Sequence, residues 1–308
     1  MPHNFKFYLS IGLALFFTTA AWSQQTLLQV VTKKIEKSYA YKEGYEVNIE
    51  GEKADVSIQT WDKAEVRIEL ELIAKHTNQE VALKDIEALK YLTQRVKNKI
   101  YLRNYVSVEE GEAKPTATLS AKYTITLPEE CPVYLKNHFG EATISNLSNR
   151  LRVNSEFSKI GLENIQGTVD LQTRFGDIIG NLIDGQVNIN SRRSDISLTN
   201  ISGSYDITAQ YGVIRIFAED QLLKLNLDAT HSDVYFFNPN PEFYAYNLVA
   251  NHGKINFPEE LNFSMLEDLP QLKKYNFKPA QKEFFATITL SVTLGDIYLE
   301  KAKKAPKL

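Results

Sequence analysis

SEFSKIGLENIQGTVDLQ, TRFGDIIGNLIDGQVNIN and SRRSDISLTNISGSYDIT are consecutive stretches of 18 residues that span residues 155–208 and share one pattern. Two more stretches, one before and one after, extend the pattern without a gap over residues 137–226. When the five stretches are aligned, apolar residues fill column six, most of column eight, and columns fifteen and seventeen. Apolar residues two apart predict short strands with one buried face, and the Asn, Ser, Gly and Asp residues between them predict turns.

One such stretch is too short to fold alone. Its apolar side chains contribute roughly 10 kcal/mol when buried, whereas ordering its backbone costs about 1–2 kcal/mol per residue. Stability must therefore come from stacking each stretch on its neighbours. We predict an all-β fold: a parallel β-solenoid with coils of 18 residues, wound as a right-handed β-helix because parallel crossings are usually right-handed. A β-rich N-terminal region carrying one helix completes the expected fold.

The remaining segments flank a solenoid that we expect over residues 133–300. Residues 1–23 combine an early lysine, a short apolar core and a small-residue ending, which predicts a cleaved secretory signal peptide. Residues 24–132 are typical of a β-rich capping region, with a helix near residues 79–96 because apolar residues recur there at helical intervals. Residues 258–283 interrupt the repeats and predict a short helix plus loop that acts as a cap.

Charge and cysteine content limit the function classes. The net charge of −3, from 35 basic and 38 acidic residues, argues against a nucleic-acid partner, although residues 301–308 form a basic tail. Cys131 is the only cysteine, so no disulfide can form within the chain. No transmembrane segment follows the signal peptide, which predicts an exported protein that is periplasmic, extracellular or associated with the cell surface. Phosphate-binding glycine loops, nucleophile elbows and zinc-binding helices are missing from the sequence, so we predict no catalytic residue, no metal site and no cofactor.

Column three holds the candidate binding residues: Phe139, Phe157, Phe175, Arg193 and Tyr211. With one coil between neighbours, about 4.8 Å, they would form a stripe that stacks on sugar rings or on the aromatic surface of a partner. The alternative is a self-stacking ladder that only shields the corner of the coil. His231 and His252 continue the column at longer spacing, and we expect them to be solvated rather than metal ligands.

Columns four and five have a regular composition as well. Column four contains only Gly or Ser, which predicts a position that needs small volume rather than a positive φ, because serine is poorly suited to positive φ. Column five repeats acidic residues at Glu141, Asp177, Asp195, Asp233 and Asp296. Outward carboxylates in a row suit calcium binding or acid–base cleavage of a polysaccharide. The minimal turns between the strands favour neither, because such enzymes build a groove from long loops.

An opening strand pair, ADVSIQTWDKAEV (54–66), precedes three repeats of similar sequence. These repeats are HFGEATISNLSNRLRV (138–153), RFGDIIGNLIDGQVNI (174–189) and RSDISLTNISGSYDI (193–207). Together they resemble the bacterial putative-adhesin family of β-strand-repeat envelope proteins, which is related to head GIN domains. The resemblance covers residues 33–300. It implies a β-repeat protein of unknown function, with no catalytic residues to carry over.

We therefore predict a non-enzymatic, exported module for cell-envelope interaction, adhesin-like or acting as a scaffold. Its partner would be an envelope protein or a glycan, and the sequence leaves the oligomeric state open. The alternative is a carbohydrate-active enzyme or glycan-binding protein that uses the outward face of the solenoid.

Overall fold

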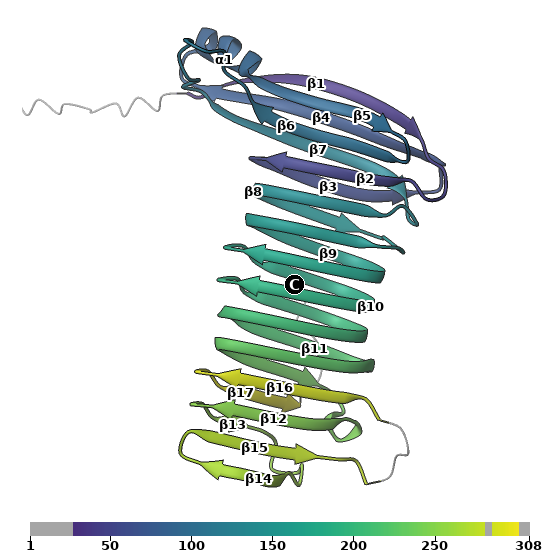
Figure 1. The fold of residues 1–308 in the computed structure, drawn as a ribbon, viewed down its shortest axis with the longest axis vertical. Helices are drawn as coiled ribbons and strands as arrows, with labels where there is room; N and C mark the ends of the chain where they lie inside the picture. The colour runs from purple at the N-terminus through teal and green to yellow at the C-terminus, as the bar shows by residue number, and fades with distance from the viewer. Residues whose placement is uncertain (1–26, 281–284, 302–308) are drawn as a thin grey trace, which may run out of the picture.

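The computed structural model, which describes residues 27–280 and 285–301, is an elongated β-solenoid with a wider β-structure at its N-terminal end (Figure 1). Most of the solenoid consists of four strands that continue around its corners: β8 (Val133–Ser145), β9 (Leu151–Arg174), β10 (Ile178–Arg192) and β11 (Ile196–Asn238). Their register is parallel, and Ile178 pairs with Ile160 on one side and with Ile196 on the other. The predicted parallel β-solenoid with 18-residue coils is therefore confirmed, while its right-handed winding stays a prediction.

The other strands extend this stack at both ends. They are β1 (Gln29–Ala40), β2 (Glu46–Glu52), β3 (Ala54–Trp61), β4 (Glu65–His76), β5 (Leu89–Val96), β6 (Lys99–Val106), β7 (Thr118–Pro128), β12 (Ala245–Asn251), β13 (Ile255–Asn256), β14 (Ser264–Leu269), β15 (Leu272–Phe277), β16 (Thr287–Thr293) and β17 (Ile297–Lys301).

Two long sheets run along the molecule. The first has the order β5-β6-β2-β8-β9-β10-β11-β16-β12-β15-β14. The second has the order β1-β4-β7-β3-β8-β9-β10-β11-β17-β13. Because β2 and β3 pair in parallel with β8, both sheets continue across residue 133.

The core lies between these sheets and follows the apolar columns. Ile160, Ile178 and Ile196 of column six are at most 1% exposed. A third, short side of the coil adds a buried column of its own: Leu147, Ile165, Ile183 and Ile201. Stacked apolar columns give a continuous core along the axis, which is how coils too short to fold alone are stabilised.

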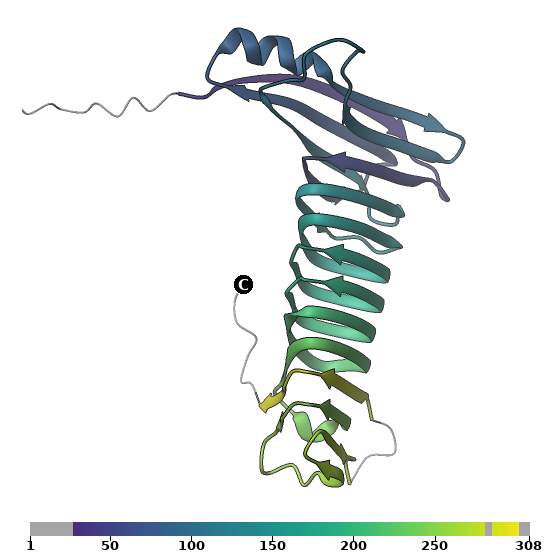
Figure 2. The same cartoon turned by 60° about the vertical axis from the view of Figure 1, so that its left-hand side comes forward.

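The helix near residues 79–96 is shorter than its periodicity predicts. The chain forms α1 (Gln79–Asp85) and η1 (Ile86–Ala88), and then strand β5. The Asp85 carboxylate, at the end of α1, accepts hydrogen bonds from the backbone N–H groups of Thr116 and Ala117. The second half of the prediction is wrong because residues from Leu89 onward pair with β6 in a hairpin, and beyond the buried Leu89 their helical spacing forms no buried face. The helix itself packs against β1 and β4 (Figure 2).

The insertion near residues 258–283 is also different from its prediction. Where the structure describes it, the segment forms the antiparallel hairpin β14–β15 rather than a short helix plus loop. The nearest short helix is η2 (Pro241–Phe243), which lies before β12. The hairpin is stable here because β15 pairs with β12 and extends the first sheet, so it covers the C-terminal end of the stack as a cap.

The last coil of the sequence is not the last coil of the stack. Strands β16 and β17 lie between β11 and the pair β12 and β13, so the chain leaves a gap, builds the terminal coil and returns to fill the gap. This order explains why Gly295 follows Gly253 by 42 residues and yet contacts the coil of Ser232.

The predicted signal peptide lies outside the described residues, as does the basic tail after Lys301. Within the part of the chain that the structure describes, no helix is long and apolar enough to cross a membrane.

Candidate functional site

The five candidate residues of column three lie where each coil turns from the first sheet to the second. Every one of them has a left-handed backbone, with φ of 61°, 52°, 55°, 55° and 58° for Phe139, Phe157, Phe175, Arg193 and Tyr211. Bulky residues rarely adopt this conformation, because Cβ approaches the neighbouring carbonyl oxygen. The structure thus places all five in one row along a corner of the solenoid, and we call this row the corner ridge.

The phenylalanines of the corner ridge stack face to face. The ring centroids of Phe139 and Phe157 lie 4.9 Å apart, and those of Phe157 and Phe175 lie 4.7 Å apart. The planes are nearly parallel, at 8° and 5°. This spacing is the distance between neighbouring strands, so the stacking is a direct result of the 18-residue register.

The ridge continues with a cation between two rings. The Arg193 guanidinium lies 5.3 Å from the centroid of Phe175 and 5.9 Å from that of Tyr211. Beyond it, His231 stacks on Tyr211 with a centroid distance of 4.8 Å. His231 therefore belongs to the ridge although the sequence analysis left it out, and its membership of column three was the signal.

The rings present their edges, not their faces, to solvent. The four aromatic residues of the original stripe are 39–44% exposed, but the ring faces between neighbouring coils are covered by the next group along the axis. At the N-terminal end, the rings of His138 and Phe139 meet edge to face, with a centroid distance of 4.5 Å and an angle of 69° between their planes. Stacking on a sugar ring requires a free aromatic face, so the ridge offers little to a glycan. A row of apolar edges fits the apolar surface of a protein better.

A second left-handed corner provides a comparison. Column ten also has positive φ, with 61°, 52°, 54° and 52° at Asn146, Asn164, Leu182 and Asn200. Asparagine is the non-glycine residue that best tolerates this backbone. Here the amides also bond along the axis, as Asn164 Nδ2 donates to Asn146 Oδ1 at 2.8 Å. Column ten thus has asparagine, which the backbone favours, at three of these four positions, whereas column three has none.

The acidic row of column five has a structural role. Oδ1 of Asp177 accepts from the backbone N–H of Asp195 at 3.1 Å, and Oδ1 of Asp195 accepts from that of Val213 at 2.8 Å. Asp55 and Asp233 make the equivalent bonds to their own next coils. Each carboxylate therefore ties one coil to the next. In the described residues, no group of three His, Cys, Asp or Glu side chains is arranged to hold a metal ion.

Column four needs small residues, as predicted. The φ of Gly176 lies outside the left-handed region, and a Cβ added there would overlap the carbonyl oxygen of Ser158 and lie 2.6 Å from its carbonyl carbon. Glycine and serine alternate, and two serine hydroxyls accept from the glycine of the preceding coil: Ser194 Oγ lies 3.3 Å from Gly176 N, and Ser232 Oγ lies 3.2 Å from Gly212 N. The column therefore combines close backbone approach with these two hydrogen bonds.

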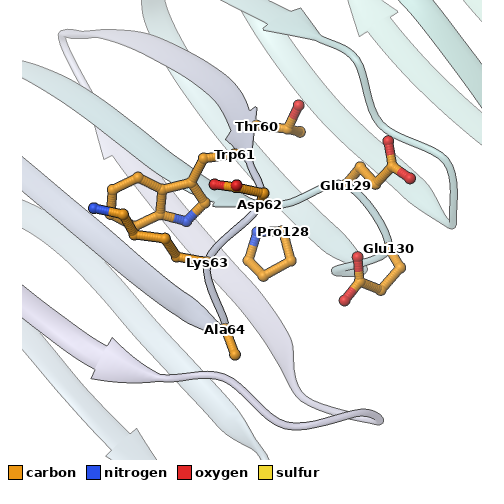
Figure 3. Close-up of a pocket in the computed structure, with 8 residues that line it drawn as sticks. All are labelled: Thr60, Trp61, Asp62, Lys63, Ala64, Pro128, Glu129 and Glu130. Carbon is orange, nitrogen blue, oxygen red and sulfur yellow. The ribbon is translucent and has the colours of Figure 1, made fainter.

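A surface depression of about 420 Å³ lies between the β3–β4 and β7–β8 turns (Figure 3). Trp61 and Lys63 lie on one side of it, and Glu129 and Glu130 project on the other. Lys63 Nζ lies 4.8 Å from the centroid of the Trp61 ring. The sequence signal was the Trp-Asp turn, but because the lysine covers the indole, the depression offers no open aromatic face.

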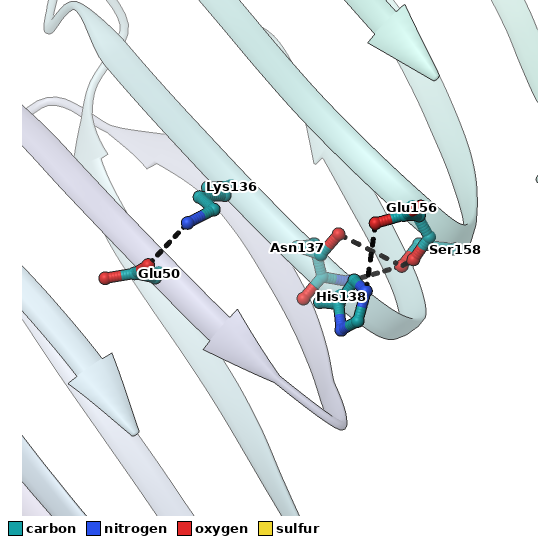
Figure 4. Close-up of polar contacts among 6 residues, drawn as sticks. All are labelled: Glu50, Lys136, Asn137, His138, Glu156 and Ser158. Carbon is teal, nitrogen blue, oxygen red and sulfur yellow. Dashed lines mark hydrogen bonds and ion pairs between the residues drawn. The ribbon is translucent and has the colours of Figure 1, made fainter. Parts of the chain in front are cut away.

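Two ion pairs lie near the N-terminal end of the ridge (Figure 4). Lys136 Nζ donates to Glu50 at 2.7 Å, and this hydrogen bond, the largest cause, holds the pKa of Glu50 below its usual value. His138 Nε2 lies 3.0 Å from a carboxylate oxygen of Glu156. Both pairs are partly solvated, so they orient side chains more than they stabilise the fold.

Residues 45–300 match the model of the Toastrack family, DUF4097. The chain belongs to the Toastrack family. The match confirms the family resemblance drawn from the repeats, and it covers most of the residues assigned to that resemblance. No curated protein matches this Toastrack chain.

Three solved structures of low identity are similar to this Toastrack chain over most of its length. A putative adhesin from Bacteroides fragilis NCTC 9343 is 13% identical, with a TM-score of 0.49 over 87% of this chain and 97% of that chain. A putative lipid binding protein from Parabacteroides distasonis ATCC 8503 is 13% identical, with a TM-score of 0.48 over the same shares. A putative adhesin from Parabacteroides merdae ATCC 43184 is 10% identical, with a TM-score of 0.38 and again the same shares. At these scores, no function is carried over from them.

Proposed function

We propose that this Toastrack chain is an exported, non-enzymatic module of the bacterial cell envelope, adhesin-like or acting as a scaffold, whose corner ridge binds a partner protein. One observation carries the proposal. The ridge places exposed aromatic and cationic side chains on a backbone conformation that disfavours them, while the equivalent corner at column ten uses asparagine in three of four coils and Leu182 in the other. Strain of this kind, of order 1–3 kcal/mol per residue, concentrates at functional sites.

A glycan partner is the second candidate, and the ring geometry weighs against it. Phe157 has a ring on each face, 4.9 and 4.7 Å away. Arg193 in turn covers one face of Phe175 and one of Tyr211. A protein partner needs only the exposed edges, which form apolar and edge-to-face contacts.

A carbohydrate-active enzyme is the third candidate. Its acid and base would be Asp177 and Asp195, but one oxygen of each already accepts a backbone hydrogen bond from the next coil. The discriminating experiment is the variant Asp177→Asn with Asp195→Asn, assayed against polysaccharide substrates. Loss of a measurable turnover in this variant would overturn the non-enzymatic proposal.

The ridge is tested by Phe157→Asn with Tyr211→Asn, because asparagine suits the left-handed backbone and keeps the corner. Purified variants are sedimented with isolated cell envelopes, and the pelleted fraction is measured. We expect the ridge variant to lose envelope retention. The matched control, Asn164→Ala with Asn200→Ala, changes the other left-handed corner and should keep it. Unchanged retention together with a lower melting temperature in the ridge variant would show that the ridge is only structural.

Export is tested separately. The apolar segment before Gln24 predicts cleavage after Ser23. N-terminal sequencing of the protein from the envelope fraction should therefore begin at Gln24, and a retained N-terminus in the cytoplasmic fraction would refute export.

A further inference from the structure

Three arginines gather at the middle of the corner ridge. Arg174 and Arg192 are direct partners in the parallel register of β9 and β10, and Arg193 follows at the corner. All three side chains are exposed. Like charges on neighbouring strands repel each other. The three residues, which we call the arginine cluster, therefore lie together at some cost to the free energy of folding.

The acidic side chains of the neighbouring columns make bonds of their own and none of them pairs with these arginines in the described residues. Glu156 occupies the same column as Arg174 one coil earlier, but its carboxylate is paired with His138 at 3.0 Å. Asp177 and Asp195 each use one oxygen to accept a backbone N–H of the next coil. In the part of the chain that the structure describes, no ion pair or hydrogen bond involves the guanidinium groups of the arginine cluster.

Two aromatic rings restrict the position of the Arg193 guanidinium. The guanidinium lies between two rings, at 5.3 Å from Phe175 and 5.9 Å from Tyr211. The two rings hold the guanidinium between them, and its N–H groups have no hydrogen-bond partner among the described residues. A planar guanidinium fixed in this way loses little entropy when it binds a carboxylate with two hydrogen bonds.

We infer that the arginine cluster binds the carboxylates of an acidic peptide segment of the partner protein. The inference rests on the proposed function of the corner ridge and specifies the chemistry of its partner. Carboxylates would bond to the guanidinium groups, and apolar side chains of the same segment would lie on the edges of Phe157 and Phe175.

Two other ligand classes fit the surroundings less well. An anionic membrane attracts basic residues near its surface by roughly 1 kcal/mol each. Asp177 and Asp195, however, lie within three residues of the cluster, and a flat anionic surface would repel their carboxylates. An acidic glycan would gain from stacking, but the ring faces are covered. An extended peptide can follow the ridge along the axis and place its carboxylates on the guanidinium groups.

The test uses the full chain and poly-L-glutamate as the probe, in fluorescence titrations at low ionic strength. Arg174→Glu with Arg192→Glu should weaken binding by about tenfold or more, as expected for two exposed ion pairs. The control, Lys37→Glu with Lys114→Glu, makes the same change in net charge at exposed sites and should leave the affinity nearly unchanged. Equal weakening by the control would overturn the inference, because binding would then follow net charge alone.

Two further arms identify the ligand class. Polygalacturonate and vesicles of equal parts phosphatidylcholine and phosphatidylglycerol replace the peptide probe. Binding of either one at least as tightly as poly-L-glutamate would overturn the assignment to a peptide. Arg174→Gln should leave the free energy of unfolding unchanged or raise it, since it removes a repulsion. A clear loss of stability would show instead that the cluster supports the fold.

Failure of the inference can be told apart from failure of the proposed function. Envelope retention is measured for the arginine variant beside the ridge variant, Phe157→Asn with Tyr211→Asn. Retention lost only in the ridge variant would refute the inference and leave the proposed function in place. Retention kept in both variants would refute both, and retention lost in both, with the controls intact, is the expected result.

Discussion

Gly176→Ser is the substitution on which sequence and structure disagree most. Column four contains serine one coil before and one coil after, so the repeat alone suggests a neutral change. In the structure, however, a Cβ at Gly176 would overlap the carbonyl oxygen of Ser158 and lie 2.6 Å from its carbonyl carbon. An ordinary contact of roughly 3.5 Å requires the two coils to separate locally by about 1 Å. That shift breaks the bond between Ile160 N–H and the carbonyl of Asp177, now 2.8 Å long.

The expected loss follows from these two effects. Overpacking costs ~1–3 kcal/mol, and a buried backbone group without its partner costs ~1–3 kcal/mol. Gly176→Ser should therefore lower the free energy of unfolding by about 2–6 kcal/mol. Urea titration followed by far-ultraviolet circular dichroism measures this quantity directly.

The matched control is Gly161→Ala in the neighbouring coil. A Cβ there would lie 3.5 Å from Thr143 Cγ2, an ordinary contact, and no left-handed backbone is involved. This variant should be neutral or more stable by up to about 1 kcal/mol, since alanine restricts the unfolded chain. If Gly176→Ser unfolds at the same urea concentration as the wild type, the inference that the coils approach too closely at Gly176 for a side chain is refuted.

Three other predictions concern single positions. Phe157→Asn should be more stable than Phe157→Ala by about 1 kcal/mol, because both lose the stacking but asparagine suits the left-handed backbone; chemical denaturation that gives the reverse order would contradict the corner geometry. Asp195→Ala should lower the free energy of unfolding by about 1–3 kcal/mol, because the backbone N–H of Val213 loses its acceptor. Asp195→Asn keeps an acceptor and should lower the free energy of unfolding much less, as measured by the same titration. For the Glu50 and Lys136 pair, the lowered pKa of Glu50 means that its stabilisation is present above its unfolded pKa of about 4.5 and is lost as pH falls through the lower folded pKa. Melting temperatures from neutral to acidic pH should therefore fall less steeply for Glu50→Gln, and identical slopes would refute the contribution.

The repeat predicts most of the solenoid because register and burial depend on the same residues. A shift by one position would move Ile160, Ile178 and Ile196 from the core to solvent, so a strand pattern that repeats without gaps allows one alignment only. The burial of these residues in the structure follows from that constraint. Column three could be placed on a corner for the same reason.

Other features depend on contacts that a periodic pattern does not contain. The helical spacing around Leu92 and Val96 is real, but pairing with β6 holds both residues in a strand, where they are 37% and 47% exposed. The stacking order of the last coils cannot be predicted from the sequence for a related reason. All coils carry similar columns, so β16 and β17 fit equally well at the end of the stack or inside it. The role of the acidic row was missed because a carboxylate that accepts a backbone N–H has no distinct sequence signature.

The two left-handed corners separate structural from functional explanations of the ridge. Both corners impose the same backbone, and both repeat once per coil. Stacking of about 0.5–1.5 kcal/mol per ring pair offsets part of the strain at column three, so it explains why phenylalanine is tolerated there. It does not explain Arg193, which replaces two ring-to-ring contacts with an exposed charge beside Arg192 and Arg174. Other unfavourable residues occur at left-handed corners, as Leu182 shows, but Leu182 is uncharged, whereas Arg193 adds a third positive charge to the cluster. The interruption lies in the middle of the exposed corner ridge, and a partner with carboxylates is the reason that accounts for it.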